Sequence, residues 1–447
     1  TRCARVTGVQ TCALPIYGTA AGVFPRWESE KSRPAMMQLH RPVEIKALSG
    51  ARALPPLMLV LYHFCEGHGY RNAPWFDLLV GKGYLWVEFF FALSGFVLTY
   101  VYGSRAADFK SGKAYIPFLK KRWARLYPLH LFTLLSLLFL MWTLNWVADL
   151  YGYVSIYHQP YPPMNTWPSF IASLFMVQAW NLFPWLTWNG ASWYVSVEFF
   201  LCILFPLYVL WARGGLGRAL TLLALGLGGL ALLAFSSKQG LLFSVAGGWP
   251  HLVVPYPPQS VGLDLTFHDS VLRGMAGFAV GVALAMLYRL ANEAGAVKLP
   301  ERLFSAAQVL VLGAMFWVFY CTGWSHSWRD IWTATALFAL IFVVSFDRGF
   351  LARALSVRPM LKLGEWSYAI YLGQTFWLQF VRTLEERVYP PGETPIFGVR
   401  FCDILWWAEP FVLLGVCVLW GALLSTLVEK PANRALRTWF TGRYRAA

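Results

Sequence analysis

Two polar residues bracket an apolar stretch, "RALPPLMLVLYHF", residues 52–64. Arg52 and His63 stand eleven positions apart. At ~100° per residue this is three turns plus about 20°, so a continuous α-helix would carry both side chains on one face, roughly 16 Å apart. That distance is about half of the hydrocarbon core of a bilayer, which predicts a path through a membrane protein. The simpler interpretation is that Arg52 snorkels to a lipid headgroup and His63 marks the opposite interface.

Two carboxylates and two further arginines extend this set. Glu88 in "WVEFFFALSGF" and Glu198 in "SWYVSVEFF" fall in apolar runs. Carboxylates in such runs are expensive and usually face a bundle interior or a wet cavity, so together with His63 they predict a proton-handling site. Arg122 and Arg125 form an RxxR motif at a helical i, i+3 spacing. Guanidinium pairs of this kind suit phosphate groups.

The elements that would hold these residues are membrane helices. Of the 447 residues, 57% are hydrophobic and only 13% are charged. Soluble domains are about a quarter charged, so this composition cannot cover a water-exposed surface. Recurrent apolar runs near 20 residues predict an all-α, polytopic membrane protein. The net charge of +15 is then a topology signal. Nucleic-acid binding is not expected, because no basic block carries interleaved aromatics.

The hydropathy pattern predicts about ten spans. They are 46–64, 83–102, 127–147, 192–211, 217–236, 270–290, 305–321, 330–346, 363–380 and 405–428. A shorter apolar piece, 168–182, is marginal for a full span and is expected to be re-entrant or interfacial.

Basic residues orient the spans. The connection 105–125 carries seven lysines and arginines and should be cytoplasmic, whereas the long connection 148–191 carries none. If 168–182 does not cross, the later basic connections and both termini are also cytoplasmic. Arg52 then lies toward the cytoplasm and His63 toward the outer side. In this scheme the simplest role of the basic segment around the RxxR motif is a positive-inside anchor.

Seven segments, in order between about residues 43 and 431, resemble the signatures of the acyltransferase-3 family, multi-pass membrane enzymes that acylate mostly carbohydrate hydroxyls. The segments are "LSGARALPPLMLVLYHF", "WVEFFFALSGFVL", "FLKKRWARLYPLH", "ASWYVSVEFFLCILFP", "LRGMAGFAVGVALA", "LGEWSYAIYLGQTFW" and "VEKPANR". Two positions depart from the family pattern. Glu88 stands where Asp is usual, and Gln374 stands where His is frequent, so no proton-transfer role is assigned to Gln374.

The resemblance implies a co-substrate, acyl-CoA (commonly acetyl-CoA), that enters from the cytoplasm, and a carbohydrate or glycoconjugate acceptor reached from the other face. No resident cofactor or metal is expected. Arg52, Arg122 and Arg125 on the inner side would hold the phosphates of CoA. The location implied is the inner membrane of a bacterial cell.

A sugar hydroxyl attacks a thioester slowly, so a positioned general base is worth ~10²–10⁴-fold. His63 is the candidate base, because burial would keep its imidazole neutral near pH 7. Glu198 would orient the ring and stabilise the imidazolium, as in a triad. A catalytic role for Glu88 is weaker, since its extra methylene moves the charge. His68 is the rival base to test.

The acceptor pocket is expected at Ser192, Trp193 and Tyr194, although core packing is the simpler role for Trp193. Arg273 is expected to pair with Asp269, four residues earlier. The alternative function is a transporter or flippase for a sugar or lipid-linked substrate, because such proteins also bury Glu, His and Arg. Against it, the sequence has no duplicated hydropathy pattern or matched broken helices.

The beginning of the chain differs from the rest. "VTGVQTCALPI", residues 6–16, resembles the in-frame translation of a sequencing-library adapter, and the stretch that follows lacks the apolar core of a signal peptide. We therefore expect residues 1–35 to be a non-native leader and 36–447 to form the membrane acyltransferase domain. The five cysteines of that domain lack CxxC spacing, which predicts neither a disulfide framework nor a metal site.

Overall fold

The computed structural model describes residues 43–68, 78, 80–150, 165–183, 186–239, 262–266, 269–324, 326–387 and 408–442. The expected leader lies outside these residues. The α-helices are α1 (Lys46–Ala51), α2 (Leu54–His68), α4 (Trp86–Tyr102), α5 (Ala106–Lys110), α6 (Tyr115–Leu150), α7 (Trp167–Leu174), α8 (Trp193–Trp211), α9 (Leu216–Gln239), α10 (Ser270–Glu293), α11 (Glu301–Thr322), α12 (Asp330–Val344), α13 (Phe350–Leu355), α14 (Arg358–Arg387), α16 (Glu409–Leu424) and α17 (Lys430–Gly442). Short 3₁₀ turns are η1 (Gly83–Leu85), η2 (Gly103–Arg105), η4 (Gly190–Ser192) and η5 (Ala296–Lys298), and η6 (Ser425–Glu429) is a π-helical turn.

The chain is an all-α, polytopic membrane protein. Within the described ranges, seven helical segments are long and apolar enough to cross a membrane. They are Gly83–Lys110, Tyr115–Leu144, Gly190–Trp211, Leu216–Ser236, Ser270–Glu293, Glu301–Thr322 and Glu409–Phe440. The expected spans at 46–64, 330–346 and 363–380 coincide with α1–α2, α12 and α14, which are not among the seven, so a total of ten stays a prediction. With only 8 residues, α7 is too short to span, which agrees with the interpretation of 168–182.

The helix expected over 46–64 is interrupted. It ends as α1 at Ala51 and resumes as α2 at Leu54. Pro55 and Pro56 explain the break, because proline has no N–H for the helical bond and its ring collides with the carbonyl four residues earlier. The prediction of one continuous helix is therefore wrong, and the shared face of Arg52 and His63 calculated from it stays a prediction. Arg52 sits in the interruption, and its backbone N–H still bonds to Leu48 O at 3.3 Å.

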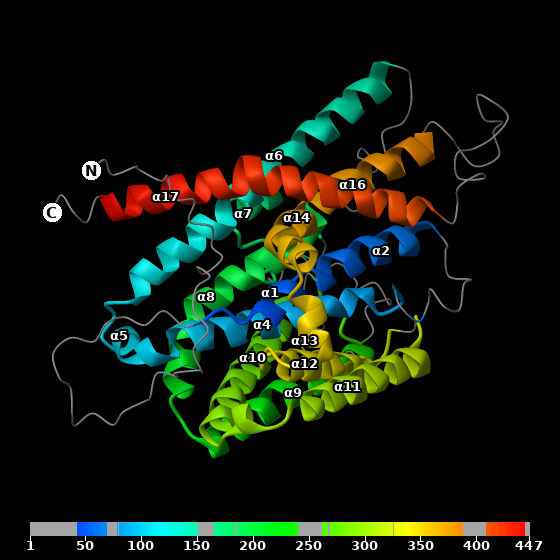
Figure 1. Ribbon diagram of the computed structural model, residues 1–447. Coiled ribbons are helices and arrows are strands. Elements are labelled where there is room, and N and C mark those ends of the chain that lie inside the picture. The colour runs from blue at the N-terminus through cyan, green and yellow to red at the C-terminus, as the bar shows by residue number, and fades with distance from the viewer. Residues whose placement is uncertain are drawn as a thin grey trace, which may run out of the picture.

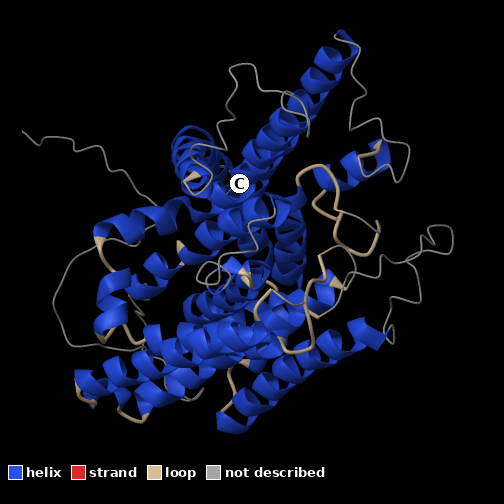
Figure 2. Ribbon diagram, turned by 90° about the vertical axis from the view of Figure 1, so that its right-hand side faces the viewer, coloured by secondary structure: helices blue, strands red, loops and turns tan. Residues whose placement is uncertain are grey.

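The centre of the bundle is the close crossing of α4 and α10. A Cβ on Gly95 would lie 2.3 Å from the carbonyl oxygen of Phe278, and one on Gly281 would lie 1.9 Å from that of Ala92. Small residues at these points let the two backbones touch, as is common between membrane helices. On one side lie α9, α11 and α12, and on the other α6 and α17 cross over α14 (Figure 1). The turned view shows helices throughout the described part (Figure 2).

One end of the bundle, named here the His63 end, gathers the beginnings of α4, α8 and α10 and the end of α2. Glu88 in the first turn of α4 pairs with Arg273 in the first turn of α10. The guanidinium of Arg273 lies 5.2 Å from the ring centroid of Trp193, the first residue of α8. The rings of Tyr62 and Tyr84, next to His63 and α4 respectively, are 5.6 Å apart.

The basic connections converge on the opposite end, named here the basic end. Arg289 donates to the carbonyl of Gly214 at 2.6 Å, between the α8–α9 connection and the end of α10. Arg348 donates to the carbonyl of Val297 at 2.7 Å, between the α10–α11 and α12–α13 connections. In Figure 1 this end lies at the left, with α5 and the end of α17. The convergence fits the positive-inside argument, and which end faces the cytoplasm stays a prediction.

Candidate functional site

Glu198 in α8 is held by groups from three helices. Its Oε1 lies 2.6 Å from Arg122 Nη2 in α6 and accepts a hydrogen bond of 2.6 Å from Ser94 Oγ in α4. Tyr194, one turn earlier in α8, donates to Oε2 at 3.4 Å. The Nε of Arg122 also donates to Cys202 Sγ at 3.4 Å. Both carboxylate oxygens are therefore engaged, and the guanidinium of Arg122 is fixed in orientation.

Arg52 and Arg125 lie near Arg122, and the charges of the three arginines repel one another. We name these residues the arginine cluster. Both Arg52 and Arg125 are half-buried, and neither side chain makes a hydrogen bond or ion pair within the described part of the chain. The carboxylates of Glu44 and Glu429 attract them only at longer range. The expectation that the RxxR motif lies beside Arg52 is confirmed as a placement.

Of the three guanidinium groups in the arginine cluster, only that of Arg122 is in direct contact with a carboxylate in the described part of the chain. Like charges repel more strongly where burial lowers the effective dielectric constant. A bound anion that accepts from guanidinium forks would relieve this repulsion, and phosphate groups match that geometry. The arrangement is therefore suited to a phosphorylated ligand.

Glu88 and Arg273 form a second ion pair, between Oε1 and Nε, in which both side chains are 0% exposed. Arg273 also donates to the backbone carbonyls of Leu265 (3.3 Å) and Tyr84 (3.4 Å). The predicted pairing of Arg273 with Asp269 is wrong. Asp269 accepts only the backbone N–H of Arg273, at 2.9 Å, because the guanidinium points across the bundle to α4 instead. This enclosed pair ties α4 to α10, and a catalytic role for Glu88 has no support from its position.

His63 is not joined to either carboxylate. Its ring centroid lies 5.3 Å from that of Tyr62, and the residue has an exposed surface at this end of the bundle. No contact between described residues links it to Glu88 or Glu198, so the predicted proton-handling trio is not assembled. The physical reason is that buried carboxylates need counter-charges, and each has found an arginine.

Around the His63 end the structure shows a buried ion pair that the sequence did not reveal. Lys82 Nζ lies 2.8 Å from Asp330 Oδ1, with side chains 1% and 0% exposed. Tyr84 OH (2.6 Å) and Leu263 N (3.0 Å) donate to the other oxygen of Asp330. The ring of Tyr84 lies 4.5 Å from that of His326. Asp330, the first residue of α12, thus binds two separate connections at this end.

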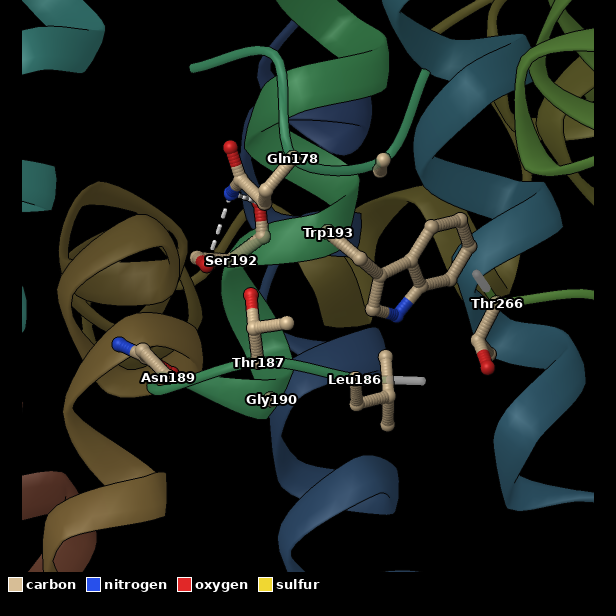
Figure 3. A pocket seen from close by; sticks show the side chains of 9 residues that line it. Gln178, Leu186, Thr187, Asn189, Gly190, Ser192, Trp193 and Thr266 are labelled. Atoms are coloured by element: carbon tan, nitrogen blue, oxygen red, sulfur yellow. Dashed lines mark hydrogen bonds between the residues drawn. The ribbon is translucent and has the colours of Figure 1, made fainter. Parts of the chain in front are cut away.

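A small pocket with a cavity volume of about 10 Å³, room for about one water molecule, lies just before α8 (Figure 3). The lining residues are Gln178, Ala179, Leu186, Thr187, Asn189, Gly190, Ser192, Trp193 and Thr266. Two of the three residues expected in an acceptor pocket, Ser192 and Trp193, are in this wall. Tyr194 is not, because its hydroxyl turns into the bundle toward Glu198.

Three polar atoms in the wall of this pocket are buried without a hydrogen-bond partner. They are Gln178 Oε1, Thr187 Oγ1 and Asn189 Oδ1. The side chains belong to residues that are only 5%, 6% and 1% exposed. Leaving one such group unsatisfied costs about 1–3 kcal/mol, so each of these oxygens calls for a small hydrogen-bond donor.

The fold and these ion pairs define a multi-pass membrane protein with two Glu–Arg ion pairs inside its helix bundle. The family model of the acyltransferase-3 domain, described as an acyltransferase domain, matches residues 45–426, and the chain belongs to this family. It is 24% identical over 410 residues to the acyltransferase MdmB of Streptomyces mycarofaciens, covering 89% of this chain and 93% of that protein. It is also 38% identical over 87 residues to protein 2 in the picA locus of Rhizobium radiobacter, covering 20% and 40% of the two chains. No solved structure matches the chain significantly.

The protein is therefore an acyltransferase. Family membership and the MdmB relative decide this point in favour of the enzyme and against the transporter or flippase considered from the sequence.

Ser94 and Glu429 were not singled out from the sequence, yet both lie inside segments that carry the resemblance, "FFFALSGFVL" and "VEKPANR". Reading every polar residue of those segments as a candidate would have found them.

Proposed function

We propose that the protein transfers an acyl group, most commonly acetyl, from acyl-CoA to a hydroxyl of a carbohydrate or glycoconjugate. The supporting observation is the pair of neighbouring guanidinium groups of Arg52 and Arg125, which have no ion-pair partner in the described residues. Coenzyme A carries a diphosphate and a further phosphate, and each offers acceptor oxygens for such groups. A co-substrate that binds and leaves would account for cations that the protein itself does not neutralise.

The proposed location is the inner membrane of a bacterial cell, with the basic end and both termini in the cytoplasm, where acyl-CoA is made. The acceptor then arrives at the His63 end, from the opposite face. The thin pantetheine arm would extend from the arginine cluster through the bundle toward His63. A surface polysaccharide, a lipid-linked glycan, peptidoglycan or a small glycoside all present the required hydroxyl.

In direct transfer, the acceptor oxygen attacks the thioester carbonyl carbon while the imidazole of His63 takes the hydroxyl proton. Collapse of the tetrahedral intermediate breaks the C–S bond, and the thiolate of CoA receives that proton. General-base assistance of this kind is worth ~10²–10⁴-fold. Glu198 contributes by holding Arg122 on the donor, rather than by orienting the histidine.

The test is His63→Ala in purified, full-length protein supplied with acetyl-CoA and a sugar acceptor. Protein abundance and acetyl-CoA binding should stay near the wild-type values, whereas transfer should fall by at least ~10²-fold. His68→Ala, at the last residue of α2, is the matched control and should change transfer little. An active His63→Ala enzyme together with an inactive His68→Ala enzyme would move the chemistry out of α2.

A further inference from the structure

We propose that Arg105, Lys121 and Arg437 form a second anion site at the basic end, which binds the 3′-phosphate of the acyl-CoA donor. The inference rests on the acyl transfer proposed above and identifies a further contact to the donor of that reaction. Its basis is the meeting of three cations from three separate elements, η2, α6 and α17, beside the arginine cluster. We name these three residues the outer basic site.

The end of α17 is packed against the beginning of α6, at the left of the bundle in Figure 1. The ring of Phe440 in α17 lies 6.3 Å from that of Trp123 in α6. At the start of α17, Lys430 Nζ lies 2.7 Å from Glu365 Oε1 in α14. Because α17 is held at both ends, Arg437, one turn before Phe440, has a fixed place beside the beginning of α6.

The three cations of the outer basic site act on one another and on a shared neighbour. The charges of Arg105 and Arg437 both act on Lys121, which is exposed and makes no hydrogen bond or ion pair within the described part of the chain. They also act on the hydroxyl of Tyr102, the last residue of α4, and so does the charge of Arg122. Tyr102 therefore lies close to both the outer basic site and the arginine cluster, so that one ligand can contact both.

The carboxylate at the outer basic site is a weak competitor for a ligand. Asp108 Oδ2 lies 3.1 Å from Arg105 Nε, and the two side chains are 47% and 46% exposed. Ion pairs that are this open to water contribute only about 0–1 kcal/mol. A phosphate monoester carries about −1.5 to −2 charges at pH 7, more than a carboxylate, and its oxygens match the N–H groups of guanidinium forks.

The donor presents phosphates at two neighbouring positions. Its diphosphate and its 3′-phosphate are attached to the 5′ and 3′ carbons of one ribose ring. A donor whose diphosphate lies at the arginine cluster therefore places its 3′-phosphate a short distance away. The exposed position of the outer basic site suits this group, because the nucleotide is the end of the donor that stays at the surface while the pantetheine arm enters the bundle.

Acetyl-CoA and 3′-dephospho-acetyl-CoA differ only in the group that the outer basic site would bind. Binding of both to the full-length protein in phosphatidylcholine nanodiscs is measured by calorimetry, with the variants Arg437→Ala and Arg105→Ala. The matched control is Arg434→Ala, an exposed arginine one turn before Arg437 whose charge does not act on Lys121. The family match ends at residue 426, before α17, so Arg437 tests this chain in particular. Melting temperatures are measured in parallel.

For the wild-type protein, removal of the 3′-phosphate should weaken binding at least about 10-fold. Arg437→Ala and Arg105→Ala should each weaken acetyl-CoA binding about 3- to 10-fold, the effect of one partly exposed contact. Both variants should bind 3′-dephospho-acetyl-CoA as the wild-type protein does, because the lost contact is absent from that ligand. Arg434→Ala should bind both ligands with unchanged affinity.

Equal weakening of both ligands by Arg437→Ala, or equal wild-type affinity for the two, would overturn the outer basic site while acetyl-CoA binding and transfer still supported the proposed function. Nanodiscs that contain phosphatidylglycerol separate the donor from a lipid. If Arg437→Ala changes binding only in those nanodiscs, the site holds lipid headgroups and the proposal is overturned. If neither ligand binds the wild-type protein, the proposed function itself fails, and the outer basic site fails with it.

Discussion

Two Glu–Arg ion pairs of the same chemistry lie in this helix bundle, in different surroundings. Glu88 and Arg273 are 0% exposed, and the other neighbours of Arg273 are backbone carbonyls and an indole ring. The Arg122 side chain of the other pair is 19% exposed, and two more arginines lie beside it. A buried pair with balanced charge joins helices, whereas a pair that belongs to an excess of one charge leaves capacity for a ligand of the opposite charge. We therefore propose a structural role for the Glu88–Arg273 pair and a role in donor binding for the Arg122–Glu198 pair.

The largest effect on folding stability is expected when one partner of the buried Glu88–Arg273 ion pair is removed. Glu88→Ala leaves the Arg273 guanidinium buried without its counter-charge, which should cost about 3–5 kcal/mol of folding free energy. Yield and melting temperature in detergent should fall sharply. The double variant Glu88→Gln/Arg273→Met should recover much of this loss, because replacing both charges removes the uncompensated one. A stable Glu88→Ala protein that binds acetyl-CoA but does not transfer would restore a catalytic role to Glu88.

On the binding side, Arg125→Ala should lower acetyl-CoA affinity roughly 10- to 150-fold, which corresponds to one charge-assisted contact of about 1.5–3 kcal/mol. The melting temperature should hardly change, because Arg125 makes no ion pair among the described residues. Arg434→Ala is again the control, since this exposed arginine of α17 belongs to neither basic site. If acetyl-CoA affinity is unchanged in Arg125→Ala, the RxxR motif serves only as the basic segment that orients the spans in the membrane.

A smaller effect is expected from Glu198→Gln, which keeps the size of the side chain and an acceptor for Ser94 but removes the charge that holds Arg122. Transfer should fall about 10-fold, less than in His63→Ala, through a weaker hold on the donor. The pH profile of transfer should keep its shape, because no contact joins Glu198 to His63. A profile that shifts along the pH axis would contradict the geometry and favour the triad expected from the sequence.

Some elements of this protein can be predicted from the sequence and others cannot, for physical reasons. Helical class and approximate spans followed from hydropathy, because a bilayer demands long apolar helices with internally bonded backbones. The interruption of the helix at Arg52 is also encoded locally, in Pro55 and Pro56. The helical period counted from Arg52 to His63 does not take these two prolines into account. The pocket before α8 was only partly foreseen, through Ser192 and Trp193. Its polar wall comes from residues 178–189, a segment with positive φ at Asn181 and Trp188, and apolar patterning carries no information about such a backbone.

The sequence by itself determined that this is a membrane protein of the acyltransferase-3 family, and it contained the arginine cluster and both Glu–Arg ion pairs in segments that resemble family signatures. Only the tertiary structure decided which carboxylate meets which arginine. Glu88 and Arg273 are 185 positions apart, and Arg122 and Glu198 are 76 apart. The need of a buried charge for a counter-charge is a local property, but its partner is chosen by how the helices pack and rotate about their axes. That choice separated Glu88 and Glu198 from His63 and left Arg52 and Arg125 without a direct ion-pair partner among the described residues.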